Sequence, residues 1–449
     1  MPSLIIPYSF LYNQEMPENT PIGITNFRNN KTPFGIKDAD RLNHIYVIGK
    51  TGTGKSTLLL NMAISDIQRS NGLCLIDPHG DIAEKILDYV PRERIRDVIY
   101  FNPADEEYVI GFNPLDNVPE EQRHLVVAGL IATFKKIWID SWGPRLEYIL
   151  RYALLTLCNY PNATLLDIQP LLTNYDFRRK VLSYCSDQYL LSFWYNEFDK
   201  YPPQLKAEAI SPILNKTGLF VAITNLRNTI GQTKSSFSIQ DVMDNQKILI
   251  CNLSKGKLGE DASTLLGSMI VNAIQLAALA RAAQHEEDRK PFYLYVDEMH
   301  SFVSLSFADI LAEARKYKLS LFMAHQYIEQ IQDKIRSAIF GNVGTMIIFR
   351  VGAEDAKQLL QEVYPVFNEE DLINLPRYSM YLKLMIDGAT SKPFSATTMP
   401  IDIPIHGYKQ EVIVWSRKVY GERREVVEMN IVVRGKNAVD EVRQNNTLF

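Results

Sequence analysis

The sequence predicts an α/β protein with a mostly parallel central sheet and an inserted all-α domain. Two observations support this fold class. Short β-branched or aromatic runs alternate with helical patterns along much of the 449 residues, which is typical of strand–helix–strand units. In one long stretch the strand pattern disappears, and apolar residues repeat at helical spacing instead. A chain of this length is expected to form roughly two or three domains.

Eight short segments are the strand candidates. They are rich in β-branched and aromatic residues, and helical patterns separate most of them, which favours a mostly parallel sheet. In chain order they are 44–49, 73–77, 97–101, 247–253, 292–298, 319–325, 344–351 and 379–386.

The segment 116–215 is the predicted all-α domain. Pro144 suits the first turn of a helix, and apolar residues follow it at helical spacing up to Leu157. The rest of the chain then divides into an N-terminal segment at 1–35, an α/β body at 36–115 and 216–398, and a polar C-terminal tail at 399–449.

Residues 44–62 combine an apolar strand, a glycine-rich turn and an apolar helical run. The turn matches the pattern GxxxxGK[ST], in the strand–turn–helix context that this pattern requires. Backbone N–H groups of such a turn point at phosphate oxygens, so we expect a bound nucleoside triphosphate. Lys55 would reach the β and γ phosphates, and Ser56 would supply a hydroxyl to Mg²⁺. The nucleotide-binding residues are then Gly49, Lys50, Thr51, Gly52, Thr53, Gly54, Lys55, Ser56 and Thr57.

The apolar run 292–298 ends in two acidic residues. Asp297 would hold Mg²⁺, and Glu298 would polarise the attacking water. An isolated acidic pair at a strand end is more often a solvated loop, but the phosphate loop upstream favours the catalytic interpretation. The seven histidines form no HxxxH or HxH cluster, so the sequence does not indicate a metalloenzyme built on histidine ligands.

Gln326 directly follows the strand candidate 319–325. Its amide could contact the γ-phosphate or the lytic water and report hydrolysis to neighbouring parts of the protein. A solvated glutamine at the strand end is equally consistent with these residues alone.

Several segments, taken in order, resemble the type IV coupling-protein ATPases of conjugation (TraG/TraD-like), in the HerA/FtsK superfamily of DNA-pumping motors. The likeness runs from about residue 35 to about residue 395. The segments that carry it are "HIYVIGKTGTGKSTLL", "LIDPHGDIAEKIL", "GFNPL", "WGPRLEYILRYALLTL", "NLSKGKLGEDASTLLG", "YLYVDEMHSF", "LAEARKYKLSLFMAHQY" and "GNVGTMIIFRVGAEDA".

The resemblance implies a RecA-like P-loop ATPase that uses ATP and Mg²⁺, assembles as a homo-hexameric ring and passes DNA through its centre. It also implies that the all-α domain engages a relaxase or an accessory protein, and that the ring can serve a membrane secretion channel. By the same resemblance Gln326 is a sensor residue. Asp77 and His79 either border the nucleotide or stabilise a turn.

Ring motors usually complete each ATP site with an arginine from the neighbouring subunit. Arg350, at the end of the strand candidate 344–351, is the preferred candidate, and Arg315 and Arg377 are its rivals. A surface arginine in a salt bridge is the alternative for each of them.

The formal charge of -4 excludes a basic excess over the whole chain, so contacts with DNA would have to come from local basic loops. Such contacts would be to phosphates, non-specific, and open to single- or double-stranded DNA. The candidate residues are Lys255, Lys257, Arg315, Lys316 and Lys318.

The expected location is cytoplasmic, or peripheral at the cytoplasmic face of the inner membrane. Four widely spaced cysteines without a CxxC pair fit a reducing compartment. The apolar stretch 263–283 is interrupted by polar residues and indicates a buried helix. Coupling proteins typically carry an N-terminal membrane anchor, whereas we find none in the roughly 40 residues before the motor core; the chain is a soluble relative or a truncated one.

Three alternatives remain open. A HerA-like DNA-repair motor should carry a β-barrel-like domain before the phosphate loop, for which roughly 40 residues are too few. A secretion ATPase that moves protein fits the weak basicity, and its ATPase rate should not respond to DNA. A non-enzymatic scaffold that binds nucleotide is disfavoured by the joint presence of Lys55, Asp297 and Glu298.

Overall fold

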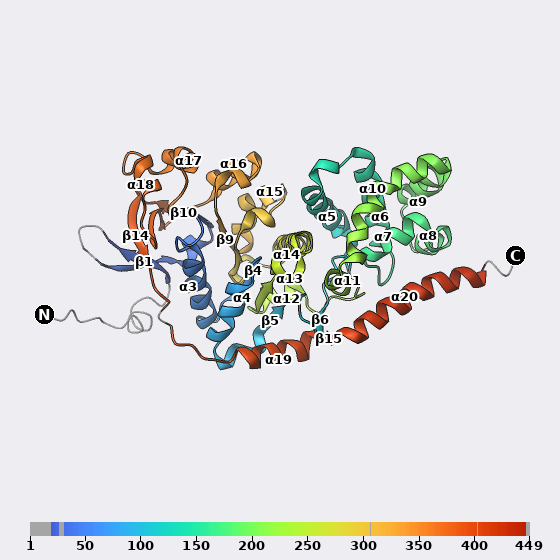
Figure 1. Cartoon of the computed structure of the whole chain (residues 1–449), viewed down its shortest axis with the longest axis horizontal. Helices are drawn as coiled ribbons and strands as arrows, with labels where there is room; N and C mark the ends of the chain where they lie inside the picture. The colour runs from blue at the N-terminus through green and yellow to red at the C-terminus, as the bar shows by residue number, and fades with distance from the viewer. Residues whose placement is uncertain (1–18, 27–30, 306, 402, 446–449) are drawn as a thin grey trace. The chain divides into compact units, whose positions relative to one another are not determined.

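The computed structural model describes residues 19–26, 31–305, 307–401 and 403–445 (Figure 1). Contacts divide the chain into two compact units. Of the described residues, the first unit comprises those up to Tyr100, together with those of Gln240–Asn252 and Ala277–Trp415, and the second those of Phe101–Ile239 and Leu253–Leu276 and those from Ser416 onward. The domain boundaries expected from the sequence stay a prediction.

The first unit is built on an 11-stranded sheet with the order β2-β1-β14-β11-β10-β3-β9-β8-β4-β7-β5. Strands β10, β3, β9, β8, β4 and β7 pair in parallel, which confirms the predicted fold class. All eight strand candidates contain strands of this sheet. They are β3 (Ile45–Ile48), β4 (Gly72–Asp77), β5 (Val98–Phe101), β7 (Ile248–Asn252), β8 (Phe292–Val296), β9 (Leu319–His325), β10 (Thr345–Ile348) and β11 (Ser379–Lys383).

Burial explains why these segments form a parallel sheet. Every residue of β3, β8 and β9 is buried, as expected for strands that are covered on both faces. Helix α3 (Lys55–Gln68) connects β3 to β4 and buries Leu58, Leu59, Met62 and Ile67 in the hydrophobic core of this unit.

Three antiparallel strands extend the sheet and were not predicted. They are β1 (Asn19–Thr25), β2 (Pro33–Lys37) and β14 (Phe394–Thr398). Both β1 and β2 contain proline and glycine, residues that in a sequence pattern usually indicate a turn or a loop and not a strand. The structure accommodates Pro21 at a register shift between β1 and β2, and a Cβ at Gly35 would lie 2.4 Å from the carbonyl oxygen of Thr20.

The predicted all-α segment is helical in the structure. Among the described residues 111–238 there is no strand, and Pro144 is the first residue of α6. The α-helices of the described residues 111–238 are α5 (Arg123–Ile137), α6 (Pro144–Leu157), α7 (Ile168–Thr173), α8 (Tyr175–Leu182), α9 (Gln188–Ser192), α10 (Pro203–Ala222) and α11 (Thr224–Ile230), so that the helical region extends beyond the predicted end at residue 215.

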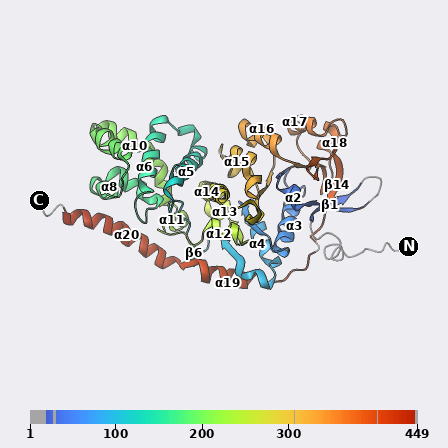
Figure 2. The same cartoon turned by 180° about the vertical axis from the view of Figure 1, so that it is seen from behind.

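The C-terminal segment, expected as a polar tail, contains α19 (Lys409–Tyr420), β15 (Gly421–Arg423) and α20 (Arg424–Asn445). Strand β15 pairs with β6 (Tyr108–Ile110) of the second unit. Helix α20 contacts α8 and α11 (Figure 2), and Arg434 forms an ion pair with Asp167 at 2.5 Å.

Helix α14 (Glu260–Ala280) covers most of the apolar stretch noted in the sequence. Within the described residues, Glu260–Ala283 is the one helical stretch long and apolar enough to cross a membrane, judged by length and composition alone. Of its most apolar window, 67% is buried, and Leu265, Leu266 and Ile270 are fully buried, as predicted for a core helix.

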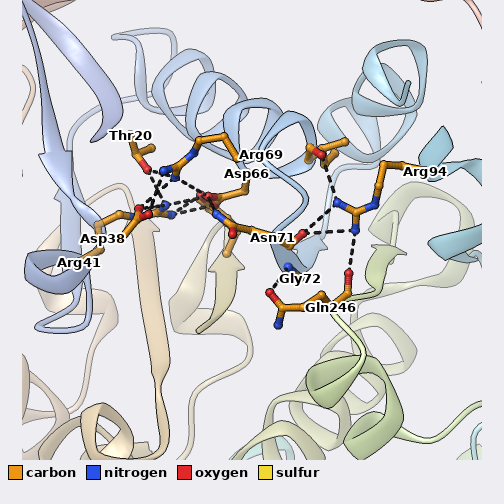
Figure 3. A network of polar contacts seen from close by, with 11 residues as sticks. Thr20, Asp38, Arg41, Asp66, Arg69, Asn71, Gly72, Arg94 and Gln246 are labelled. Atoms are coloured by element: carbon orange, nitrogen blue, oxygen red, sulfur yellow. Dashed lines mark hydrogen bonds and ion pairs between the residues drawn. The ribbon is translucent and has the colours of Figure 1, made fainter. Parts of the chain in front are cut away.

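A partly buried ion cluster, which we call the N-terminal clamp, consists of Asp38, Arg41, Asp66 and Arg69 (Figure 3). Both nitrogens Nη1 and Nη2 of Arg41 donate to the Asp66 carboxylate at 2.8 Å, and both side chains are at most 1% exposed. Arg69 joins Asp38 to Asp66. Burial by itself raises the pKa of Asp66, but the Arg41 guanidinium more than compensates, so that the pKa lies below its usual value. The clamp therefore ties α2 (Asp38–Arg41) to the end of α3.

We expect Arg41→Ala to lower the free energy of unfolding by about 3–5 kcal/mol, because Asp66 would stay buried without its main counter-charge. Lys357→Ala is the matched control, since it removes only the exposed ion pair with Glu354 and should leave the unfolding midpoint unchanged. Urea unfolding followed by far-ultraviolet circular dichroism, which reports the helices of both units, measures both variants. A midpoint for Arg41→Ala equal to that of the control would contradict the importance of the clamp.

Candidate active site

The phosphate loop lies between the end of β3 and the start of α3, as predicted. Gly52 and Gly54 have φ angles of 74° and 131°, in the region that favours glycine. A Cβ at Gly49 would lie 2.5 Å from Cβ of Phe349. The backbone of the loop therefore requires glycine at these three positions.

Lys55 is folded back over this loop. Its Nζ donates to the carbonyl oxygens of Gly49 at 2.5 Å and Lys50 at 3.3 Å, and the residue is 6% exposed. Burial lowers the pKa of the Lys55 ammonium, while the carboxylates of Glu298 and Asp297 oppose that shift. The lysine is thus held at the loop, close to the acidic pair.

Asp297 and Glu298 directly follow β8, and both are buried. The backbone N–H of Asp297 donates to the carbonyl oxygen of Ile76 at 3.1 Å, so its position depends on the neighbouring strand β4. Burial, together with the nearby carboxylates of Glu298 and Asp77, raises the pKa of Asp297 to about 7. A negative cluster of this kind is stabilised by a cation.

The residues fit Mg²⁺ better than a metal held only by protein. Within the described residues, no group of three or more His, Cys, Asp or Glu side chains could hold a metal ion. Mg²⁺ is usually bound by one or two carboxylates together with substrate phosphates and water. Asp297, with Ser56 exposed at the start of α3, would supply such a partial set of ligands.

Gln326 lies beside the acidic pair. It follows β9, the strand between β3 and β8, and its Nε2 donates to Oε1 of Glu298 at 2.9 Å. The other carboxylate oxygen of Glu298 lies 3.4 Å from Nδ1 of His300. The structure therefore brings Lys55, Asp297, Glu298 and Gln326 together, and sequence reasoning missed His300.

Asp77 has a structural role in this unit. Its carboxylate accepts hydrogen bonds from the backbone N–H groups of His79, Ile82 and Ala83 at 2.8–2.9 Å. These bonds hold the turn between β4 and α4 (Asp81–Ile86), which agrees with the turn-stabilising alternative.

The three candidate arginines lie at different places in the first unit. The carbonyl oxygen of Arg350 accepts from the N–H of Lys50 at 2.8 Å, so Arg350 lies at the phosphate loop of its own chain. Nη1 of Arg315 donates to Oδ1 of Asn43, which precedes β3 and thus lies at the opposite end of the strands. Arg377 covers the ring of Tyr378, with its Cζ 4.7 Å from the ring centroid.

The predicted DNA-contacting residues fall into two groups. Lys255 and Lys257 lie in α13 (Lys255–Leu258) of the second unit, where Lys255 forms an ion pair with Glu260 at 3.2 Å. Arg315, Lys316 and Lys318 precede β9 in the first unit. Because the two groups belong to different units, neither unit contains all five residues.

Tyr378 was not selected from the sequence. Its N–H donates to the carbonyl oxygen of Thr53 at 2.8 Å, which places it against the phosphate loop although 325 positions separate the two residues. The tyrosine directly precedes β11, and no local pattern in the sequence marks that position as close to the loop.

Comparison with known proteins identifies relatives of the chain. At 22% identity over 376 residues, the chain matches the type 4 coupling protein DotL of Legionella pneumophila, and the match covers 70% of this chain and 48% of DotL. The chain thus spans about half the length of that curated relative.

Two solved structures share the fold at low sequence identity. The plasmid coupling protein TrwB in complex with ADP and Mg²⁺ matches with a TM-score of 0.61 at 16% identity, over 86% of this chain and 92% of TrwB. VirB4 of Thermoanaerobacter pseudethanolicus matches with a TM-score of 0.54 at 14% identity, over 88% of this chain and 98% of VirB4.

A family model described as the type IV secretion-system coupling protein DNA-binding domain matches residues 33–374, well over half of the chain. This range includes the phosphate loop, the acidic pair after β8 and Gln326 after β9. The chain therefore belongs to the family of the type IV secretion-system coupling protein DNA-binding domain, as its sequence motifs indicated.

Proposed function

We propose that the protein is an ATP-hydrolysing DNA translocase of the coupling type. The observation that carries this proposal is the convergence of Lys55, Asp297, Glu298 and Gln326 at the ends of three adjacent parallel strands, β3, β9 and β8. In this arrangement Lys55 would bind phosphates, Asp297 would bind the metal ion, Glu298 would act as the base, and Gln326 would act as a polar sensor. A scaffold that only binds nucleotide would not need the last two.

In the proposed mechanism, the loop Gly49–Thr57 binds the phosphates of ATP through its backbone N–H groups, and Lys55 neutralises the β and γ phosphates. Ser56 and Asp297 would hold Mg²⁺, which neutralises charge that develops on the phosphates. Glu298 orients and polarises the attacking water as a general base.

The hydrogen bond between Gln326 and Glu298 suggests how hydrolysis is controlled. A carboxylate oxygen that accepts the Gln326 amide at 2.9 Å is less available to a water molecule. We infer that Gln326 turns toward the γ-phosphate when ATP binds and thereby releases Glu298 for catalysis. The same movement would report the nucleotide state to the strand ends around β9.

Membership of the coupling-protein family supports the partners that we propose. They are DNA as a non-specific cargo, five further copies of the chain in a hexameric ring, a relaxase or accessory protein at the helices of 116–215, and a membrane secretion channel. The proposed location is the cytoplasm or the cytoplasmic face of the inner membrane. TrwB has been solved with ADP and Mg²⁺ and with ATP and GTP analogues, which supports ATP and Mg²⁺ as the cofactors here.

A second candidate function is the transport of protein cargo. The observation that favours it is the formal charge of -4, which offers no overall attraction for DNA phosphates. The two candidate functions share the ATP site and differ in what stimulates it.

We expect single- or double-stranded DNA to raise the ATPase rate of the full chain, and the stimulation to weaken as salt is raised, because its contacts would be to phosphates. Lys255→Ala combined with Lys257→Ala should reduce the stimulation and leave the basal rate unchanged. Steady-state phosphate release with and without DNA tests this, and Lys55→Ala controls for contaminating ATPases. A rate that DNA does not change would favour protein cargo instead.

Glu298→Gln is expected to keep ATP binding and to lower turnover by about 100-fold or more, because glutamine cannot accept the proton of the attacking water. Glu329→Gln is the matched control. Because the Glu329 side chain is exposed, this variant should hydrolyse ATP at the wild-type rate. Equilibrium binding of ATP and single-turnover hydrolysis separate the two effects. Unchanged turnover in Glu298→Gln would disprove its assignment as the base.

Arg350→Ala should bind ATP and assemble but fail to hydrolyse it, and a mixing experiment can locate its action. If Arg350 acts in trans, mixed rings of Arg350→Ala and Lys55→Ala subunits recover activity, because intact sites form between unlike neighbours. If it acts in its own subunit, where its carbonyl contacts Lys50, the mixture stays inactive. Arg315→Ala, mixed in the same way, tests the rival arginine, and wild-type turnover in Arg350→Ala would exclude Arg350.

A further inference from the structure

Tyr378 is an aromatic side chain at the phosphate loop that the proposed mechanism does not use. Its N–H donates to the carbonyl oxygen of Thr53, and a Cβ at Gly54 would lie 3.2 Å from Cδ1 of its ring. The residue is nevertheless 39% exposed, although it directly precedes a strand of the central sheet. A partly exposed ring thus lies against the loop where phosphates are expected.

The backbone holds this ring in a fixed place. Tyr378 has a φ angle of 65°, which is unusual for a residue with a bulky side chain. Two hydrogen bonds enforce it, because the N–H of Tyr378 donates to Thr53 and its carbonyl oxygen accepts from the N–H of Thr398 at 2.8 Å. Strained backbone of this kind occurs preferentially at functional sites. The guanidinium of Arg377 lies over the ring and orients it further.

The order of the strands indicates which part of a nucleotide would reach this ring. Asp297, Glu298 and Gln326 follow β8 and β9, on one side of β3, so the terminal phosphate must face that side. Tyr378 precedes β11, which lies on the other side of β3, beyond β10. If the terminal phosphate of a nucleotide points toward Glu298, its ribose and base therefore lie on the opposite side of β3, near β10 and β11.

We propose that Tyr378, supported by Arg377, forms the nucleobase subsite of the ATP site. The purine base stacks on the exposed part of the Tyr378 ring, whose position relative to the phosphates is set by the bond to Thr53. Stacking uses the π-face that every base has and reads no hydrogen-bond pattern. The subsite therefore accepts adenine and guanine with similar affinity. This inference rests on the proposed function, since it assumes that the loop binds a nucleoside polyphosphate.

Two substitutions distinguish the contribution of the Tyr378 ring to nucleotide binding from the contribution of its backbone. Tyr378→Asn removes the ring, and asparagine tolerates a positive φ better than most residues, so the loop before β11 keeps its shape. Tyr378→Phe retains the stacking surface and loses only the hydroxyl. Two ligands likewise distinguish binding of the phosphates from binding of the base. ADP and inorganic pyrophosphate both carry a diphosphate, and pyrophosphate lacks the ribose and base.

The experiment is calorimetric titration of the full chain with ADP, GDP and pyrophosphate in the presence of Mg²⁺. For Tyr378→Asn we expect ADP and GDP to bind on the order of 10-fold more weakly or worse, as for loss of one stacked base, with unchanged pyrophosphate affinity. Tyr378→Phe should bind all three ligands like the wild type. Wild-type affinity of Tyr378→Asn for ADP overturns the proposal, and so does an equal loss of ADP and pyrophosphate, which would indicate damage to the loop.

Lys55→Ala distinguishes failure of the subsite from failure of the proposed function. It should weaken ADP and pyrophosphate together, because Lys55 acts on the phosphates. If the wild-type chain binds neither ligand, the proposed ATPase function falls, and the base subsite falls with it. If Lys55→Ala loses both ligands while Tyr378→Asn binds ADP normally, the phosphate site stands and only the base subsite is refuted.

Discussion

The parallel register of β3, β9 and β8 is the constraint on which the site depends. Ile48 pairs with His325, and Val296 pairs with Met323, so all three strands run in one direction and end at the same edge of the sheet. The phosphate loop, Gln326 and the acidic pair follow those ends directly. Hydrogen bonding between the strands brings them to this edge, and the side-chain bond from Gln326 to Glu298 then joins two of them.

That convergence has an electrostatic cost, and Lys55 offsets part of it. The carboxylates of Asp297, Glu298 and Asp77 lie close together in a buried place, which raises the pKa of Asp297 to about 7. Lys55 lies near enough to lower it again in part. The site therefore combines buried carboxylates with a buried lysine, so that a cation such as Mg²⁺ would compensate the carboxylates and anionic phosphates would take up the charge of the lysine.

The antiparallel strands, on the other side of β3, also position a residue at the phosphate loop. Tyr378 meets Thr53 just before β11 begins, and Thr398 at the end of β14, which pairs with β11, donates to the carbonyl oxygen of Tyr378. The N-terminal clamp secures the far end of α3, the helix whose first turn carries Lys55. The contact between Tyr378 and Thr53 joins residues far apart in the sequence, whereas the clamp joins segments that are close along the chain; together they support the loop and the helix that follows it.

The sequence by itself determined the strand–helix alternation, the phosphate loop, the acidic pair and the helical segment. Each of these is a local pattern in which a few adjacent residues set backbone shape and chemistry. Only the tertiary structure decided that Gln326 bonds to Glu298, that Arg350 lies at its own phosphate loop and that Tyr378 lies beside Gly54. These facts depend on strand order, and strand order is set by packing between distant segments, which no local pattern records.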